Sequence, residues 1–349
     1  MKKSEYRFNF ITVASVISAI AVVLLHTNSF WQYSHSLRWE LANIVNCSLI
    51  FAVPIFFMIS GATLIDYSDR YDTKTFLKKR FKKTLIPFIV WSLVAVLIHA
   101  LFLKDLPKGA YSFQSIIMGV LSATYVPIYW FFIPLFVNYL SMPLFTITRK
   151  KDRKNTFRYL IVLGLVLNAA IPFALKLAGI NWNFPYTISI ISGALYYLVV
   201  GYYISHYQIS KRMRIIIYIF GLISLLMMIL GTSAESHAAG KVMGSWRGLD
   251  VITYMIYAPA VFLAIKNITE RLRLEEHEKI ARFFARFAKY TFAIYLLHYF
   301  FLALFEKCIP LSHSSPIYFL IASPVVTILP CVAAMVFRRI PLLKAALPE

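Results

Sequence analysis

The feature that most constrains the fold is a series of long apolar runs separated by short charged segments. A helix needs roughly 20 apolar residues to cross the hydrocarbon core of a bilayer, and helices keep every backbone hydrogen bond inside the segment. The sequence therefore predicts an all-α, polytopic membrane protein with about ten transmembrane helices. The predicted spans are 10–29, 41–65, 84–103, 127–147, 157–178, 184–205, 213–231, 248–266, 287–306 and 316–338.

The distribution of basic residues predicts the orientation of these spans. Lys and Arg are enriched in the cytoplasmic loops of membrane proteins. With ten spans and a cytoplasmic N-terminus, 29 of the 36 Lys and Arg residues fall on the cytoplasmic side. Both termini are therefore predicted to be cytoplasmic. The net charge of +21 follows mostly from this topology and does not argue for nucleic acid as a partner. Some of the basic residues are expected to contact anionic lipids of the bilayer.

Two segments between the runs are expected to be helical without crossing the membrane. Residues 111–126 are too polar and short for a span, and we expect a re-entrant or interfacial piece there. Residues 267–286 contain ERLRLEEHEK and are expected to form an amphipathic cytoplasmic helix. No repeat or appended soluble segment is visible, so we expect residues 1–349 to form a single integral-membrane domain.

The cysteines do not suggest a metal site or a disulfide. Cys47, Cys308 and Cys331 lie in or near spans and have no metal-ligand spacing. Cys47 could carry an acyl group, but a small buried residue is the stronger expectation.

The histidine in the first span is the leading candidate for chemistry. His26 follows an almost wholly apolar stretch, and a titratable side chain at membrane depth usually faces a cavity or a partner. Histidine also exchanges a proton near neutral pH. Glu40, at the start of the second span, should lie at similar depth, where its carboxylate could orient the imidazole. Pairing of Glu40 with Arg38 in a solvated loop is equally compatible with the sequence.

Two further polar pairs lie on helix faces. Asn43 and Asn46 are three residues apart, so they share a face and could bind a substrate hydroxyl or join helices. Arg80 and Lys83 also share a face, where the span is entered from the cytoplasm. Such a pair can bind phosphate, although an ordinary basic flank explains the composition better.

Trp130 and His298 are weaker candidates. Trp130 begins the fourth span, where an interfacial aromatic belt accounts for it. His298 lies deep in the ninth span, where a hydrogen bond between helices would explain it.

Five segments together resemble the acyltransferase-3 family of integral-membrane acyltransferases. Any one is weak evidence, but their order and spacing extend over nearly the whole chain. The segment from Glu40 to Asn46 is also similar to the branch that acetylates enterobacterial common antigen. The five segments are Ser15 to His26, Ala52 to Gly61 (AVPIFFMISG), Phe76 to Trp91, Tyr129 to Phe132 and Thr291 to His298.

The resemblance implies transfer of an acyl group, usually acetyl, from cytoplasmic acyl-CoA to a sugar hydroxyl. The acceptor would be a glycan of the cell envelope or its lipid-linked precursor. The protein would then lie in the cytoplasmic membrane of a bacterium. Acetyl-CoA or another acyl-CoA would be a co-substrate, with no bound cofactor. His26 matches the essential histidine of the family, and Arg80 and Lys83 match its paired basic positions. Ser60, Trp130 and His298 also match motif positions of the family.

One departure from the family pattern falls on the first helix. The family arginine eleven positions before the histidine is Ser15 here. Three consequences are open: another residue such as Arg7 or Arg80 supplies the charge, the donor differs, or acyl transfer has been lost.

The expected mechanism joins an inner donor site to an outer catalytic site. Eleven residues of helix span roughly 16 Å, which suits an extended pantetheine arm between phosphates near Arg80 and Lys83 and the thioester near His26. His26 would act as a general base for direct attack, and an acyl-histidine intermediate stays open. The competing readings are a lipid or glycan transporter and a non-catalytic accessory protein of polysaccharide synthesis, although no inverted repeat is visible.

Overall fold

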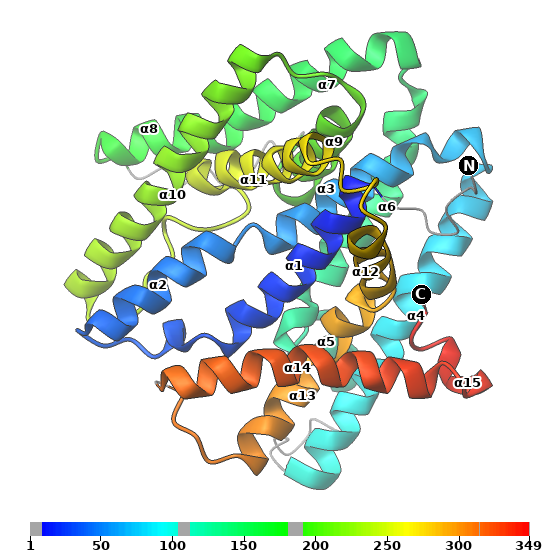
Figure 1. The fold of residues 1–349 in the computed structure, drawn as a ribbon, viewed down its shortest axis with the longest axis vertical. Helices are drawn as coiled ribbons and strands as arrows, with labels where there is room; N and C mark the ends of the chain where they lie inside the picture. The colour runs from blue at the N-terminus through cyan, green and yellow to red at the C-terminus, as the bar shows by residue number, and fades with distance from the viewer. Residues whose placement is uncertain (1–8, 104–111, 181–190, 314, 349) are drawn as a thin grey trace.

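The computed structural model describes residues 9–103, 112–180, 191–313 and 315–348, and within these ranges the chain is helical without any strand (Figure 1). Nine helical segments in the described ranges are long and apolar enough to cross a bilayer. This confirms an all-α polytopic membrane protein. The sixth predicted span, 184–205, begins outside the described residues, and its described part is the 14-residue helix α9 (Gly193–His206).

The helices correspond closely to the predicted spans, with several extended or divided. Short 3-10 or π segments join some of them, among them η2 (Ile65–Asp69) and η4 (Pro127–Phe131). The remaining helices are α1 (Phe10–Thr27), α2 (Leu37–Leu49), α3 (Ala52–Leu64), α4 (Thr73–Ile98), α5 (Phe113–Leu121), α6 (Phe132–Ile147), α7 (Lys150–Leu165), α8 (Ile171–Leu177), α10 (Lys211–Ala239), α11 (Ile252–Arg271), α12 (Glu278–Ala288), α13 (Thr291–Cys308), α14 (Pro316–Phe337) and α15 (Pro341–Lys344).

Helix α1 occupies the middle of the bundle. Asn9 precedes its first residue and caps the first turn, because the Asn9 side chain accepts a hydrogen bond from the Thr12 backbone amide at 3.2 Å. Its apolar residues pack against α3, α11, α12, α13 and α14, and Figure 1 shows it running between α2 and α12. A helix covered on so many sides presents its few polar side chains to other helices.

The second predicted span, 41–65, is divided into two helices. Helix α2 ends at Leu49 and α3 begins at Ala52. Pro54 lies in the first turn of α3, where its missing N–H removes no intrahelical hydrogen bond. Helix α3 then packs closely on α9, because Gly61 and Gly201 have no side chain. A Cβ atom at Gly61 would lie 1.8 Å from the Leu198 carbonyl oxygen.

Contacts between distant segments define what we call the basic end of the bundle, the end where α1 begins. There the rings of Phe10 and Phe262 are 5.5 Å apart. Lys150 Nζ lies 2.5 Å from Asp69 Oδ2, and Arg338 donates to the Lys289 carbonyl at 2.9 Å. The charged residues at this end lie in or at the edge of segments predicted to be cytoplasmic, and the orientation in the membrane stays a prediction.

The two segments expected not to cross are partly as predicted. Residues 111–126 contain the short helix α5, none of whose side chains is buried. Helix α11 continues to Arg271, so the amphipathic helix starts later than expected, at Glu278 in α12. The three cysteines are free thiols, and Cys47 is buried as expected.

Candidate functional site

Two histidines from opposite ends of the sequence meet in the bundle. The rings of His26 on α1 and His298 on α13 have centroids 5.2 Å apart. His26 lies in the last turn of α1 and is exposed, whereas His298 is completely buried. Next to His26, the Thr27 and Ser323 hydroxyls share a hydrogen bond of 2.7 Å that holds α1 against α14. The pair therefore combines one accessible imidazole with one buried imidazole, and the first of them lies where α1 is hydrogen-bonded to α14.

Backbone contacts determine which nitrogen of His298 carries hydrogen. Its Nδ1 lies 2.9 Å from the Ile294 carbonyl oxygen and 2.8 Å from that of Tyr295. Carbonyl oxygens only accept, so Nδ1 donates, and the neutral ring carries its lone pair on Nε2. Within the described residues, this buried Nε2 has no hydrogen bond partner. A buried acceptor without a partner is costly, which makes it a candidate group for binding or proton transfer.

Aromatic contacts bring the other family-like segments to the same region. Phe57 of α3 stacks on Phe131 at 4.8 Å, and Phe131 lies 5.0 Å from the ring of Tyr295. Phe88 of α4 lies 6.0 Å from Tyr129. Together with the histidine pair, these contacts assemble all five segments that resemble the acyltransferase-3 family.

Two tyrosine hydroxyls connect η4 to α13 within one helical turn of His298. The Tyr129 hydroxyl donates to the Leu296 carbonyl at 2.8 Å, and the Tyr295 hydroxyl donates to the Ile128 carbonyl at 2.5 Å. Both hydroxyls are thus satisfied in a buried setting, which restricts the segments to one register. Trp130, to which the sequence drew attention, follows Tyr129 in η4 and is 45% exposed. Ser60, also expected at the site, donates to the Phe56 carbonyl within α3.

Glu40 has a different partner from the two that were expected. Its Oε1 lies 2.5 Å from His237 Nε2 and accepts from the Ser233 hydroxyl at 2.7 Å, both on α10. The structure therefore pairs this carboxylate with α10, where the sequence suggested His26 or Arg38. The correction follows from the direction in which α2 presents its side chain, which the sequence does not specify.

The two asparagines of α2 have hydrogen bond partners in other segments of the bundle. Asn43 is buried and donates to the Ile229 carbonyl on α10 at 3.0 Å. Asn46 accepts from Arg247 Nη1 at 2.6 Å. Arg247 also lies over the Phe30 ring at 4.3 Å, and burial lowers the pKa of its guanidinium. Asn43 thus joins α2 to α10, one of the two roles predicted for the pair, whereas Asn46 contacts the segment between α10 and α11.

The basic pair of α4 differs in burial between its two members. Arg80 is half-buried, and its buried Nε has no hydrogen bond partner within the described residues, whereas Lys83 is exposed. Asp72 precedes the helix and caps it by accepting hydrogen bonds from the Thr75 hydroxyl and backbone amide. These hydrogen bonds lower the pKa of the Asp72 carboxyl. The buried Nε donor of Arg80, unused within the described residues, makes this arginine a candidate for an anion site.

Ser15, where the family has arginine, is half-buried and faces another helix. Its hydroxyl donates to the Thr291 hydroxyl at 3.1 Å, and Thr291 donates to the Ala288 carbonyl at 2.9 Å. Position 15 thus lies at the junction of α12 and α13. A residue at this position meets polar groups before it meets lipid.

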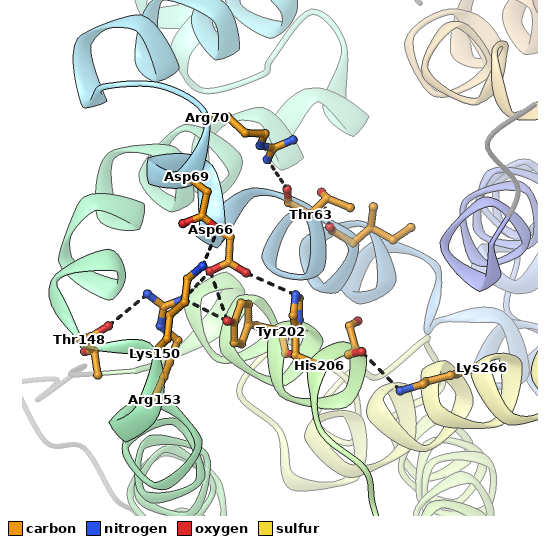
Figure 2. Close-up of polar contacts among 12 residues, drawn as sticks. Thr63, Asp66, Asp69, Arg70, Thr148, Lys150, Arg153, Tyr202, His206 and Lys266 are labelled. Carbon is orange, nitrogen blue, oxygen red and sulfur yellow. Dashed lines mark hydrogen bonds and ion pairs between the residues drawn. The ribbon is translucent and has the colours of Figure 1, made fainter.

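Sequence reasoning missed an ionic cluster at the basic end, shown in Figure 2. Arg153, one of the 29 Lys and Arg residues that the predicted topology places on the cytoplasmic side, is only 2% exposed and lies 2.5 Å from Asp66 Oδ1. The Tyr202 hydroxyl lies 3.3 Å from the same oxygen, and His206 Nε2 lies 3.4 Å from Asp66 Oδ2. An acidic residue at the end of a span was the available signal, because charges at that depth are normally paired.

A polar cavity of about 660 Å³ opens beside this cluster, between the start of α1 and the ends of α3 and α9. Asp66 and Asp69 are among its walls, together with Arg70. The two carboxylates disfavour phosphate in this cavity. The basic face with Arg80 is therefore the better candidate for an anionic donor.

Comparison with known proteins agrees with this assembly of segments. Searches of the curated proteins and of the solved structures found no match. The sequence model of one family, described as an acyltransferase domain, matches residues 8–335. Because this match covers nearly the whole chain, including the histidine pair and every segment around it, the protein belongs to the acyltransferase 3 family and is a membrane acyltransferase.

Proposed function

We propose that the protein transfers an acyl group, in the first instance acetyl, from cytoplasmic acyl-CoA to a hydroxyl of an envelope glycan or its lipid-linked precursor. The observation that carries the proposal is the pairing of exposed His26 with buried His298 where the family-like segments meet. Acyl transfer to a hydroxyl requires a group that removes the hydroxyl proton, and histidine suits that role at neutral pH.

In the proposed reaction, His26 is the general base. It accepts the proton of the sugar hydroxyl while the oxygen attacks the thioester carbonyl. The carbon–sulfur bond then breaks, and His26 returns the proton to the departing CoA thiolate, so that the products are the ester and free CoA. His298 presents a second lone pair on Nε2 beside His26. We assign His298 the role of positioning His26 during proton transfer.

Arg80 and Lys83 are proposed to hold the donor phosphates. Arginine binds phosphate through directed donors, and the buried Nε of Arg80 has no hydrogen bond partner within the described residues. Both residues precede Pro87 on α4, at the basic end, and this end is predicted to face the cytoplasm where acyl-CoA is found. The similarity of residues 40–46 to the enterobacterial common antigen branch favours a glycan acceptor of that kind.

The direct test measures CoA release from acetyl-CoA by proteoliposomes that contain the full chain and its candidate lipid-linked glycan. We expect release that depends on both the protein and the glycan, and that is lost in a His26→Ala protein. Labelled acetyl should appear on the glycan in equal amount. CoA release by the His26→Ala protein at the rate of the parent would overturn the mechanism.

The Ser15 departure keeps a non-catalytic function as the second candidate, since the family arginine is expected to help bind the donor. A transporter or accessory protein would move or bind the glycan lipid without consuming acetyl-CoA. Flipping of a fluorescent lipid-linked glycan in the same proteoliposomes, without CoA release, would support that function over acyl transfer.

A further inference from the structure

The amphipathic helix α12 forms a cleft with α14 that the proposed reaction does not use. The cleft has a volume of about 440 Å³ and is lined by Lys279, Arg282, Phe283, Arg286, Phe287, Tyr290, Ile328 and Cys331. From this composition we propose that it binds one anionic phospholipid of the surrounding bilayer, with the phosphate on the arginines of α12 and an acyl chain along the apolar floor.

The charges around the cleft match an anion. Lys279, Arg282 and Arg286 follow one another at spacings of three and four, so they lie along one face of α12. The lining residues include no carboxylate, in contrast to the cavity beside Asp66. Arg282 also forms an ion pair with Glu278, a residue that does not line the cleft. Basic pockets of this kind bind the headgroups of anionic lipids.

The floor of the cleft matches an acyl chain. Phe283 is 58% exposed and Ile328 is 56% exposed, although both are large apolar side chains. Cys331 lies six residues before the end of α14, which corresponds to about 9 Å of helix. The apolar lining of the cleft therefore extends from the end of α14 into its membrane-spanning part. A soluble phosphate would leave this apolar surface uncovered, whereas a lipid covers it.

The cleft is held in place by contacts that tie α12 to the rest of the bundle. Arg338, at the end of α14, donates to the Lys289 carbonyl at 2.9 Å and lies over the Tyr290 ring at 5.4 Å. Helix α12 also packs against α1 (Figure 1). The geometry of the cleft therefore depends on contacts between helices and not on an exposed loop.

The test is native mass spectrometry of the full chain released from nanodiscs of phosphatidylcholine with phosphatidylglycerol. We expect one retained phosphatidylglycerol per chain, unaffected by millimolar inorganic phosphate. The Arg282→Gln/Arg286→Gln protein should retain at least about tenfold less, the factor expected for one lost charge-assisted hydrogen bond. The control is Arg271→Gln/Arg273→Gln, which removes equal charge outside the cleft and should retain the lipid.

A second measurement uses the folded protein with its arginines intact. In a Cys308→Ser background, phosphatidylglycerol should slow the modification of Cys331 by a methanethiosulfonate several-fold compared with phosphatidylcholine alone. Equal rates in both lipids, equal retention of phosphatidylcholine, or displacement by inorganic phosphate would each overturn the proposal. Loss of the lipid in the Arg271→Gln/Arg273→Gln protein would show general charge attraction and would overturn it as well.

Discussion

His26 and His298 lie with their ring centroids 5.2 Å apart, one exposed and one buried. They come from the first and one of the last helices of the bundle. Neutral His298 has its lone pair on Nε2, because Nδ1 donates to backbone carbonyls. This relationship gives the two imidazoles different tasks, and the first two predictions separate them.

Replacement of His26 by Ala should lower the rate of acyl transfer by about 10²–10⁴-fold, the contribution of a general base. His35 provides the matched control, because it is exposed and its ring is hydrogen-bonded to Tyr33. His35→Ala should leave the rate near that of the parent protein. Both rates are measured as CoA release at equal amounts of folded protein.

His298→Asn and His298→Gln should behave differently. The Asn amide can still donate to the Ile294 carbonyl but has no group at the place of Nε2, whereas the Gln amide reaches that place. We expect kcat to fall about tenfold or more in His298→Asn and to recover in part in His298→Gln, with KM for acyl-CoA unchanged. A purely structural role would instead lower the amount of folded protein in both and leave kcat intact.

Neutralising Arg80 and Lys83 together as Gln should raise KM for acyl-CoA. Each lost charge-assisted hydrogen bond corresponds to about 1.5–3 kcal/mol of binding free energy. Lys78→Gln/Lys82→Gln removes the same charge from exposed positions of the same helix and serves as the control. An equal change in both double variants would mean that only the general basic flank matters.

Ser15→Arg should be tolerated and should maintain or increase the use of acetyl-CoA. Position 15 faces the Thr291 hydroxyl, so a guanidinium there meets polar groups. Ser18 is the matched control, because it is completely buried and its hydroxyl has no partner within the described residues. Ser18→Arg should prevent accumulation of folded protein, measured by size-exclusion chromatography. Loss of the folded Ser15→Arg protein would favour the non-catalytic function.

Asp66→Asn should destabilise the protein far more than Asp69→Asn. Arg153 is 2% exposed and depends on Asp66 for charge compensation, so loss of that carboxylate leaves a buried cation. The expected decrease in the free energy of unfolding is about 3 kcal/mol, the lower end of the range for broken buried pairs, because Asp66 is 26% exposed. Asp69 pairs with Lys150 at the surface, and its replacement should leave thermal unfolding in detergent nearly unchanged.

The sequence by itself determined the helical membrane class, the approximate positions of the spans and the family. Helix hydrogen bonds are local, so a run of apolar residues specifies a span without reference to the rest of the chain. The same reasoning identified His26, because a titratable side chain in such a run is costly and therefore conspicuous.

Only the tertiary structure decided which polar side chains meet. The partner of a side chain depends on the rotation and tilt of its helix, which result from packing against all neighbours at once. The close approach of Gly61 to Leu198 is one such contact. Helix packing of this kind directs Glu40 to His237, buries Arg153 beside Asp66 and brings His298 to His26. Long-range pairs of this kind are not encoded in the local pattern of any one helix.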